Sequence, residues 1–373
     1  MLYHLLTPLS SQFFGFNVFN YISFRAAGAT FTAILLAFIV GPVIIKRLKE
    51  QGVGQIIRTD GPASHHSKRG TPTMGGLILL ICTIIPTLLW ARLDSQYVLV
   101  IAVATLWMGA IGFIDDYLKV VQGKARGLVA RYKLVGQVIF GVALGSYLLL
   151  WPVAANLPPN ATTLPFFKYV LVQLHPILYL GFVTFVVTAS SNAVNLTDGL
   201  DGLAAGLTVI AAAAFAFCAY VFGRIDYSDY LLVYYLRGAG ELAVFCAALM
   251  GAALGFLWYN AHPSEVFMGD TGSLAIGGAF GTVAILLKSE FLLLLIGAVF
   301  AAETLSVIIQ TIVFRWRTIR HGREYARQHR VFRMAPLHHH FEQLGWSESK
   351  IVTRFYIIAI MCALFALATM KIR

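Results

Sequence analysis

Four amide and carboxylate side chains recur at every third position in a short polar stretch between two apolar runs. They are Asn192, Asn195, Asp198 and Asp201, and a helical or nearly helical backbone would place them along one face. A plain connection between membrane helices would not need such regular spacing. Ionisable groups at the edge of a membrane are costly and usually functional, so the stretch indicates a binding or catalytic site.

Two further acidic groups lie at the borders of apolar runs. Asp115 and Asp116 are adjacent, and such a pair needs Mg²⁺ or a lysine; Lys119 follows one helical turn later. The run Gly-Asp-Thr-Gly-Ser at 269–273 combines Asp270 with hydroxyls and open backbone N–H groups. That combination suits a metal-bound phosphate, although it is also good chemistry for a turn or a helix N-cap.

Two basic segments carry the other side chains that could handle phosphate. Three consecutive histidines, 338–340, cannot all face one way, so a zinc site made from them alone is not expected. One or two could carry protons or donate hydrogen bonds to phosphate. The segment around Lys68 and Thr73 precedes a Gly-Gly helix start and could bind phosphate, or its charges could simply anchor the chain. Glu303 lies in an apolar run and needs a partner.

The elements that must position these residues are membrane-spanning helices. The 373 residues are 58% hydrophobic and 12% charged, about half the charge of a soluble domain. We therefore expect an all-α, polytopic integral membrane protein that forms a single domain, 1–373. Apolar runs of sufficient length predict about ten spans, at 24–45, 74–90, 97–114, 134–151, 169–188, 203–222, 241–258, 274–287, 291–314 and 351–370.

The basic residues are unevenly distributed between the connections. Loops 46–73, 115–133 and 315–350 carry 19 of the 28 Lys and Arg residues, and all three follow odd-numbered spans. The positive-inside rule makes that side cytoplasmic, together with connections 189–202 and 259–273, and places both termini on the periplasmic side. The net charge of +11 then indicates contact with the lipid bilayer. Nucleic-acid binding is excluded, because it would need a basic extramembrane module.

The acidic and histidine motifs described above, apart from Glu303, fall on this predicted cytoplasmic side. Carboxylates with Mg²⁺ and nearby cations form a set that handles phosphate, and the membrane location indicates that one substrate is a lipid. The residues therefore favour phosphoryl transfer between a soluble nucleotide compound and a lipid phosphate. An ion-coupled transporter is the alternative class, and it would place its carboxylates near mid-span in repeat-related broken helices.

Several motifs in order give a more specific resemblance. The segments 113–119, 192–203, 267–273 and 336–342 resemble the signatures of the polyprenyl-phosphate N-acetylhexosamine-1-phosphate transferases. The Pro-Leu-His-His-His-Phe-Glu run, with Thr-Pro-Thr-Met-Gly-Gly at 71–76, is similar to the phospho-N-acetylmuramoyl-pentapeptide transferase (MraY) branch. A sister branch that uses UDP-GlcNAc shares the aspartates and is expected to lack the triple histidine.

The resemblance implies a reaction, a cofactor and a location. UDP-MurNAc-pentapeptide and undecaprenyl phosphate would react with Mg²⁺ to give lipid I and UMP, at the inner membrane of a bacterium. The family also suggests a homodimer. Direct attack by the lipid phosphate and a double displacement through a covalent aspartyl intermediate both stay open.

The resemblance also implies roles for individual residues. Asp270 would be the Mg²⁺ ligand, Asp115 or Asp116 would be the base, and His338 would belong to the same catalytic set. Lys119 and Lys133 would neutralise phosphates. Phe267 could stack on uracil. The rest of the expected substrate-binding set is Lys68, Thr73, Asn192, Asn195, Asp198, Asp201, Asn260, His339 and His340.

Overall fold

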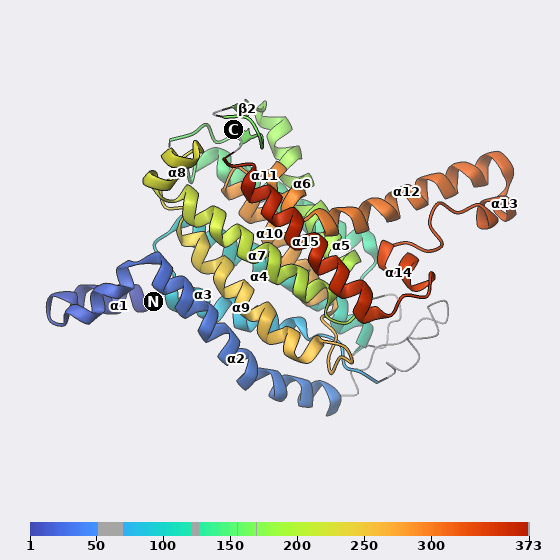
Figure 1. Cartoon of the computed structure of the whole chain (residues 1–373), viewed down its shortest axis with the longest axis horizontal. Helices are drawn as coiled ribbons and strands as arrows, with labels where there is room; N and C mark the ends of the chain where they lie inside the picture. The colour runs from blue at the N-terminus through green and yellow to red at the C-terminus, as the bar shows by residue number, and fades with distance from the viewer. Residues whose placement is uncertain (51–69, 121, 123–126, 155, 169, 372–373) are drawn as a thin grey trace.

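The computed structural model describes residues 1–50, 70–120, 122, 127–154, 156–168 and 170–371. It is a bundle of long helices, with α1 projecting at one end and α12 at the other (Figure 1). The long helices are α2 (Ile22–Glu50), α3 (Gly76–Trp90), α4 (Gln96–Val120), α5 (Ala130–Leu150), α6 (Pro176–Thr197), α7 (Leu203–Phe222), α9 (Glu241–Asn260), α10 (Gly269–Leu286), α12 (Ala298–His321) and α15 (Glu348–Ala368).

Short elements connect these helices. The helical ones are α1 (Leu2–Leu6), η1 (Thr7–Ser11), η2 (Phe14–Asn20), α8 (Ile225–Leu231), α11 (Glu290–Ile296), α13 (Arg323–Gln328) and α14 (Leu337–Glu342). Two strands, β1 (Ala161–Thr163) and β2 (Leu171–Gln173), pair antiparallel with Thr162 opposite Val172. The all-α prediction is therefore confirmed, with one small hairpin added to it.

Eight of the described helices are long and apolar enough to cross a membrane, so the chain is a multi-pass membrane protein. Each of the ten predicted spans overlaps one long helix, but α3 has 15 residues and α10 has 18, and neither is among the eight. The count of ten spans and the orientation of the chain stay predictions.

Two predicted spans have the wrong boundaries. The span predicted at 291–314 is divided into α11 and α12 at Gly297, the residue at which one helix ends and the next begins. The span predicted at 169–188 begins too early, because β2 occupies part of that range. Helix α6 starts at Pro176, and proline is accepted at a helix start because its missing N–H is not needed there.

Helices also extend into ranges that were predicted as cytoplasmic loops. Helix α4 continues through Asp115 and Asp116 to Val120, and α6 continues through Asn192 and Asn195 to Thr197. In the range 315–350, α12 continues to His321, and α13 and α14 follow. The polar residues of α4 and α6 are therefore held by helix backbone.

Helix α10 is the buried centre of the bundle, with every residue from Thr271 to Leu286 buried. It packs on α4 and α6, the two helices that carry the other polar motifs. The contact with α4 joins the two backbones directly, since a Cβ on Gly112 would lie 2.1 Å from the carbonyl oxygen of Asp270. This close approach brings the two acidic motifs together.

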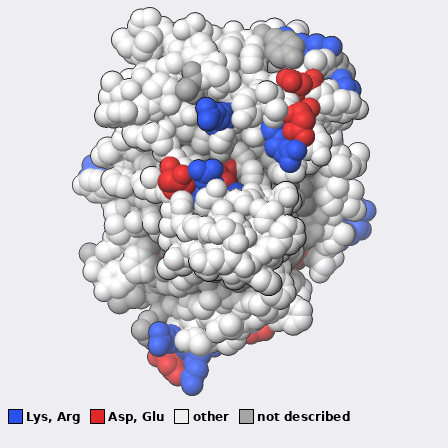
Figure 2. All heavy atoms as spheres, turned by 90° about the vertical axis from the view of Figure 1, so that its left-hand side faces the viewer, with Lys and Arg blue, Asp and Glu red and all other residues white. Residues whose placement is uncertain are grey.

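A buried ion pair lies far from that contact, near the N-terminal end of α2. Two guanidinium nitrogens of Arg25 donate to the two carboxylate oxygens of Glu241, each at 2.6 Å, and the backbone N–H of Arg92 donates to the same carboxylate at 2.9 Å. The pair ties α2 to α9 and to the chain that follows α3. The face of the molecule toward α1 carries few charges, gathered in small groups of both signs (Figure 2).

Candidate functional site

Three carboxylates from two helices form the acidic centre, which we define as Asp115, Asp116 and Asp270. Asp115 and Asp116 lie near the C-terminal end of α4, and Asp270 lies in the first turn of α10. One carboxylate oxygen from each lies within 4.8 Å of the other two. Asp115 and Asp116 are buried, while Asp270 is partly exposed. The grouping that the resemblance implied is present.

Two lysines bridge the acidic centre. The ammonium of Lys133, on α5, lies 2.6 Å from Oδ2 of Asp270 and 3.3 Å from Oδ2 of Asp115. Lys119 forms an ion pair with Asp115 and lies 3.3 Å from Oδ2 of Asp270. The side chains of Lys119 and Lys133 are 36% and 22% exposed, so both can reach a ligand outside the centre. These cations offset the cost of placing carboxylates at a membrane edge.

Asp116 has a different role from Asp115 in the geometry. It accepts the backbone N–H groups of Asp270 at 3.1 Å and of Thr271 at 2.8 Å, and the Thr271 hydroxyl at 2.6 Å. The two N–H groups belong to the first turn of α10, where a helix offers no carbonyl acceptor of its own for them. Asp116 therefore caps α10 from another helix and fixes the position of Asp270.

The acidic centre has the donors that a hard divalent cation requires. Mg²⁺ prefers oxygen ligands and is usually bound by one or two carboxylates together with water and phosphate oxygens. Asp270 suits this role best, because it is the most accessible of the three carboxylates. A second group with metal-ligand atoms within 4.8 Å of one another comprises Asp201, His262 and Glu348.

The amides of the α6 stretch have separate partners. Asn195 donates to Oδ1 of Asp270 at 2.9 Å and to the Ser273 hydroxyl at 2.8 Å, so it belongs to the acidic centre. Asn192 instead donates to Oε1 of Gln137, on α5, at 2.9 Å. Asn192 therefore lies about one helical turn from Asn195 and contacts α5 instead of the acidic centre.

The two aspartates that follow α6 do not continue the stripe, because the helix ends at Thr197. Asp198 is half-buried near Asp270 and Asp116; loss of solvation, reinforced by those two negative charges, raises the pKa of Asp198 to about 8. Asp201 contacts the loop after α9: its carboxylate lies 2.9 Å from Nδ1 of His262 and accepts the Ser264 hydroxyl at 3.0 Å. The expectation that all four residues share one face is wrong.

Asn260 connects two loops through hydrogen bonds of its side chain. Its carbonyl oxygen accepts the backbone N–H of Gly202 at 3.1 Å, and its amide donates to the carbonyl of Val266 at 2.9 Å. The side chain is buried, so both of its polar atoms serve the protein itself. Its expected contact with a substrate stays a prediction, and the geometry gives it a supporting position.

The three consecutive histidines face three different partners, as their spacing predicts. Nδ1 of His338 lies 3.2 Å from Glu303, and Nδ1 of His339 lies 2.6 Å from Glu342. Nδ1 of His340 accepts the backbone N–H of Arg333 at 3.1 Å. His338 is almost completely buried and forms no hydrogen bond or ion pair with the acidic centre among the described residues, so its expected catalytic role stays a prediction.

The segment before α3 pairs with the segment before α10. The backbone N–H of Phe267 donates to the carbonyl of Pro72, and that of Gly75 donates to the carbonyl of Phe267, both at 2.8 Å. Thr73 is buried in this pairing, and the Phe267 side chain is partly exposed beside it. Lys68, the other predicted phosphate ligand of this segment, lies outside the described residues.

Three polar residues of the site escaped the sequence analysis: Gln137, His262 and Glu348. Gln137 had a readable signal, because it lies one helical turn after Lys133 in an otherwise apolar helix and so shares its face. His262 and Glu348 had no such signal, since they come from a loop and from the start of a distant helix.

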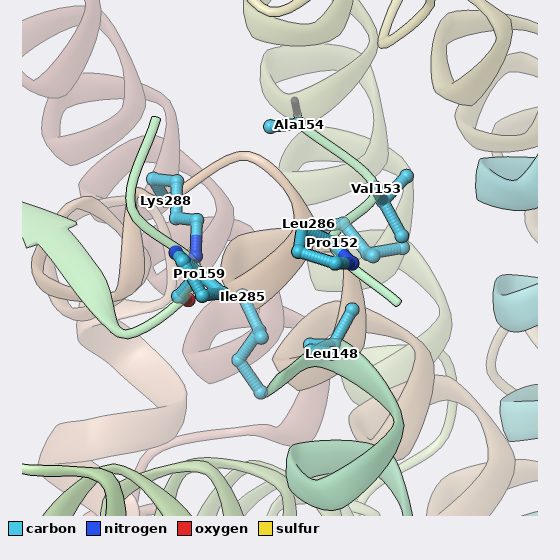
Figure 3. Close-up of a pocket in the computed structure, with 8 residues that line it drawn as sticks. All are labelled: Leu148, Pro152, Val153, Ala154, Pro159, Ile285, Leu286 and Lys288. Carbon is cyan, nitrogen blue, oxygen red and sulfur yellow. Dashed lines mark hydrogen bonds between the residues drawn. The ribbon is translucent and has the colours of Figure 1, made fainter. Parts of the chain in front are cut away.

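A small cavity lies away from this chemistry. It has a volume of about 10 Å³ and is lined mainly by apolar side chains from the end of α5, the chain after it and the end of α10, with Lys288 as its charged member (Figure 3). The volume is close to that of a single water. No residue of the acidic centre lines it, so this cavity is separate from the acidic centre.

The carboxylates lie at helix ends rather than near mid-span, which counts against the transporter alternative. A helical membrane domain with acidic, lysine and amide side chains at one set of helix ends defines an integral-membrane transferase of the phosphate-handling class. The family model for glycosyl transferase family 4 matches residues 98–288, which include most of this set. The phospho-N-acetylmuramoyl-pentapeptide-transferase signature 1 matches residues 68–80.

Relatives that match over their full length show which transferase family the chain belongs to. The chain is 60% identical to the phospho-N-acetylmuramoyl-pentapeptide-transferase of Gemmatimonas aurantiaca, 49% identical to that of Geobacter sp. and 46% identical to that of Desulfotalea psychrophila. Each match covers 100% of both chains. The chain belongs to the phospho-N-acetylmuramoyl-pentapeptide-transferase family.

Proposed function

We propose that the chain transfers phospho-MurNAc-pentapeptide from UDP-MurNAc-pentapeptide to undecaprenyl phosphate, giving lipid I and UMP. An oxygen of the lipid phosphate forms a bond to the β-phosphorus of the nucleotide sugar. The bond from that phosphorus to the bridging oxygen breaks, and its electron pair leaves with UMP. This would be the first membrane step of peptidoglycan synthesis, at the bacterial inner membrane with the acidic centre toward the cytoplasm.

The observation that carries the proposal is the acidic centre itself, joined to Lys119 and Lys133. Its three carboxylates and two ammonium groups converge from three helices at one set of helix ends. Both phosphates of the reaction are anionic, so cations must neutralise them as they approach. Lys119 and Lys133 are exposed enough to turn from carboxylate to phosphate.

Mg²⁺ completes the proposed site, with Asp270 as its ligand and with oxygens of Asp115 and Asp116 close by. When bound, the ion polarises phosphate oxygens and neutralises the charge that develops on them. Asn195 donates to Oδ1 of Asp270 and so fixes the direction of Oδ2, the oxygen that faces Lys119 and Lys133. Asp116 holds α10 in place through its capping contacts.

Asp115 is the better candidate for the base that readies the lipid phosphate. The oxygens of Asp116 are occupied by the first turn of α10, whereas Oδ2 of Asp115 faces the ammonium groups of Lys119 and Lys133. Once the lysines turn to phosphate, Asp115 regains acceptor capacity for a proton. Direct attack needs only this one carboxylate, and we favour it over a covalent aspartyl intermediate.

The nucleotide sugar would occupy the surface between the acidic centre and the Phe267 segment. The partly exposed Phe267 ring can stack on uracil, and Thr73, Asp198 and Asn192 lie on the elements around it. Asp201, Asn260, His339 and His340 would complete the substrate-binding set, and Lys68, outside the described residues, stays a predicted member of it. The homodimer implied by the family also stays a proposal.

UMP release by the detergent-purified protein tests the function. With undecaprenyl phosphate, Mg²⁺ and UDP-MurNAc-pentapeptide, we expect release that stops when the metal is chelated. UDP-GlcNAc serves as the matched alternative donor, and release with it alone would assign the sister reaction. No release with either donor, from folded protein supplied with lipid, would overturn the proposal.

A further inference from the structure

Glu303 is a fully buried carboxylate in α12, and both of its oxygens face the same residue. Its Oε1 accepts the backbone N–H of His338 at 3.2 Å, and its Oε2 lies 3.2 Å from Nδ1 of the His338 ring. The contact between Oε2 and Nδ1 does not have the geometry of a hydrogen bond. Neither atom has another hydrogen-bond partner among the described residues. One residue of α14 therefore presents two nitrogens to one carboxylate.

The opposite edge of the same ring contacts the turn between α6 and α7. A Cβ on Gly199 would lie 2.2 Å from Nε2 of His338, so the ring rests against the glycine backbone. Gly199 follows Asp198 directly, and that turn also leads to Asp201. The His338 side chain is 1% exposed, which means that it is wedged between α12 and the aspartate-bearing turn.

The chemistry of the carboxylate selects one form of the ring. An ionised carboxylate only accepts hydrogen bonds, and Oε1 already accepts one N–H from His338. The matching arrangement at Oε2 is an Nδ1–H donor, which needs only a small turn of the ring to align. Nδ1 then bears a proton, and Nε2 is the nitrogen held toward Gly199.

We propose that Glu303 is a positioning residue for the transferase: it holds the Nδ1–H form of His338 and thereby fixes the turn that carries Asp198. The kinetic part of this inference rests on the proposed function. Besides Glu303 on α12, the ring contacts the ring of His339 on α14, with the two centroids 4.2 Å apart, and Asp198 precedes Gly199 in the chain. Glu303 would act through His338 on the turn that carries Asp198, a residue of the proposed nucleotide-sugar site.

Nitrogen NMR of the wild-type protein tests the ring form without any need for activity. The protein is labelled with ¹⁵N-histidine, and the His338 signals are assigned from their loss in His338→Gln. We expect a proton bonded to Nδ1. A ring with a bare Nδ1 and a proton only on Nε2 would overturn the inference, because Glu303 would then not be the acceptor.

Glu303→Gln tests the positioning role. The amide keeps the size of the side chain but places an NH₂ group against one of the two His338 nitrogens, so one contact is lost. We expect kcat/KM for the nucleotide sugar to fall at least about tenfold, UMP affinity measured by calorimetry to fall with it, and KM for the lipid to stay within about twofold.

The matched control is Glu290→Gln, another buried glutamate, which lies outside the proposed site. We expect its kinetics to stay within about twofold of wild type. Wild-type kinetics in a folded Glu303→Gln protein would overturn the inference, and if that variant does not fold, the nitrogen spectrum decides. If wild-type protein released no UMP, the proposed function would fail while the spectrum would still test the Glu303–His338 contact.

Discussion

The ammonium of Lys133 lies 2.6 Å from a carboxylate oxygen of Asp270, and this contact joins α5 to α10. Lys133 also lies 3.3 Å from Asp115, so a single cation serves carboxylates from two further helices. The contact engages Oδ2 of Asp270, the residue that we propose as the Mg²⁺ ligand. On that proposal, Lys133 would compete with the metal for this carboxylate.

Lys133→Gln should change metal affinity and turnover in opposite directions. We expect Mg²⁺ to bind more tightly, because its competitor is gone, while UMP release falls about a hundredfold because a phosphate-neutralising group is lost. Calorimetric titration with Mg²⁺ and a UMP-release assay measure the two effects. Unchanged Mg²⁺ affinity would show that Lys133 and the metal do not share Asp270.

Asp270→Asn should abolish UMP release while the protein still inserts and folds. The amide can still accept the Asn195 hydrogen bond through its oxygen, but it cannot supply the negative charge that a metal ligand needs. Size-exclusion profile and thermal unfolding serve as the controls for folding. Turnover at the wild-type rate would remove Asp270 from the metal role.

Asp116→Asn should mainly reduce stability. An amide placed against the three donors of the first turn of α10 leaves at least one of them without an acceptor. The expected loss is on the order of 1–3 kcal/mol, seen as a lower midpoint of thermal unfolding. A midpoint equal to that of wild type would show that the cap contributes nothing.

Gly112→Ala should separate α4 from α10, because the added Cβ would meet the carbonyl of Asp270 at 2.1 Å. Overpacking of this kind costs on the order of 1–3 kcal/mol, and the shift of Asp270 should lower UMP release as well. The matched control is Gly181→Ala in α6, where a Cβ meets nothing within 4 Å. Equal thermal midpoints for the two variants would contradict the backbone contact.

The pH dependence of stability should change in Glu290→Gln. Burial raises the pKa of Glu290 from 4.5 to about 7, so the folded protein binds a proton that the unfolded chain has released. Wild-type stability is therefore lost as pH rises from about 4.5 to about 7, by on the order of 3 kcal/mol, while glutamine does not titrate. Thermal unfolding at about pH 5 and about pH 8 measures the difference. If the midpoints of thermal unfolding of the variant and the wild type differ equally at both pH values, the raised pKa of Glu290 is contradicted.

The acidic centre was largely predictable from sequence, because Asp115, Asp116 and Asp270 each stand at the border of an apolar run. Helix borders of neighbouring spans meet at one level of the bundle, and so do these side chains. The predicted common face from Asn192 to Asp201 was wrong for Asp198 and Asp201, because the spacing of these residues does not reveal that α6 ends at Thr197. The partner of Glu303 was unpredictable for a different reason, since His338 follows 35 positions later through a long connection.

The contact of Gly112 with the carbonyl of Asp270 has a consequence for how this chain can vary. Most helix pairs can be brought slightly closer or further apart by exchanging one side chain for a smaller or larger one. Here main chain rests on main chain, so no intermediate residue exists that would adjust the separation of the two acidic helices by a fraction of an ångström. Variation in substrate preference must therefore come from the surrounding loops, while the spacing of the carboxylates stays constant.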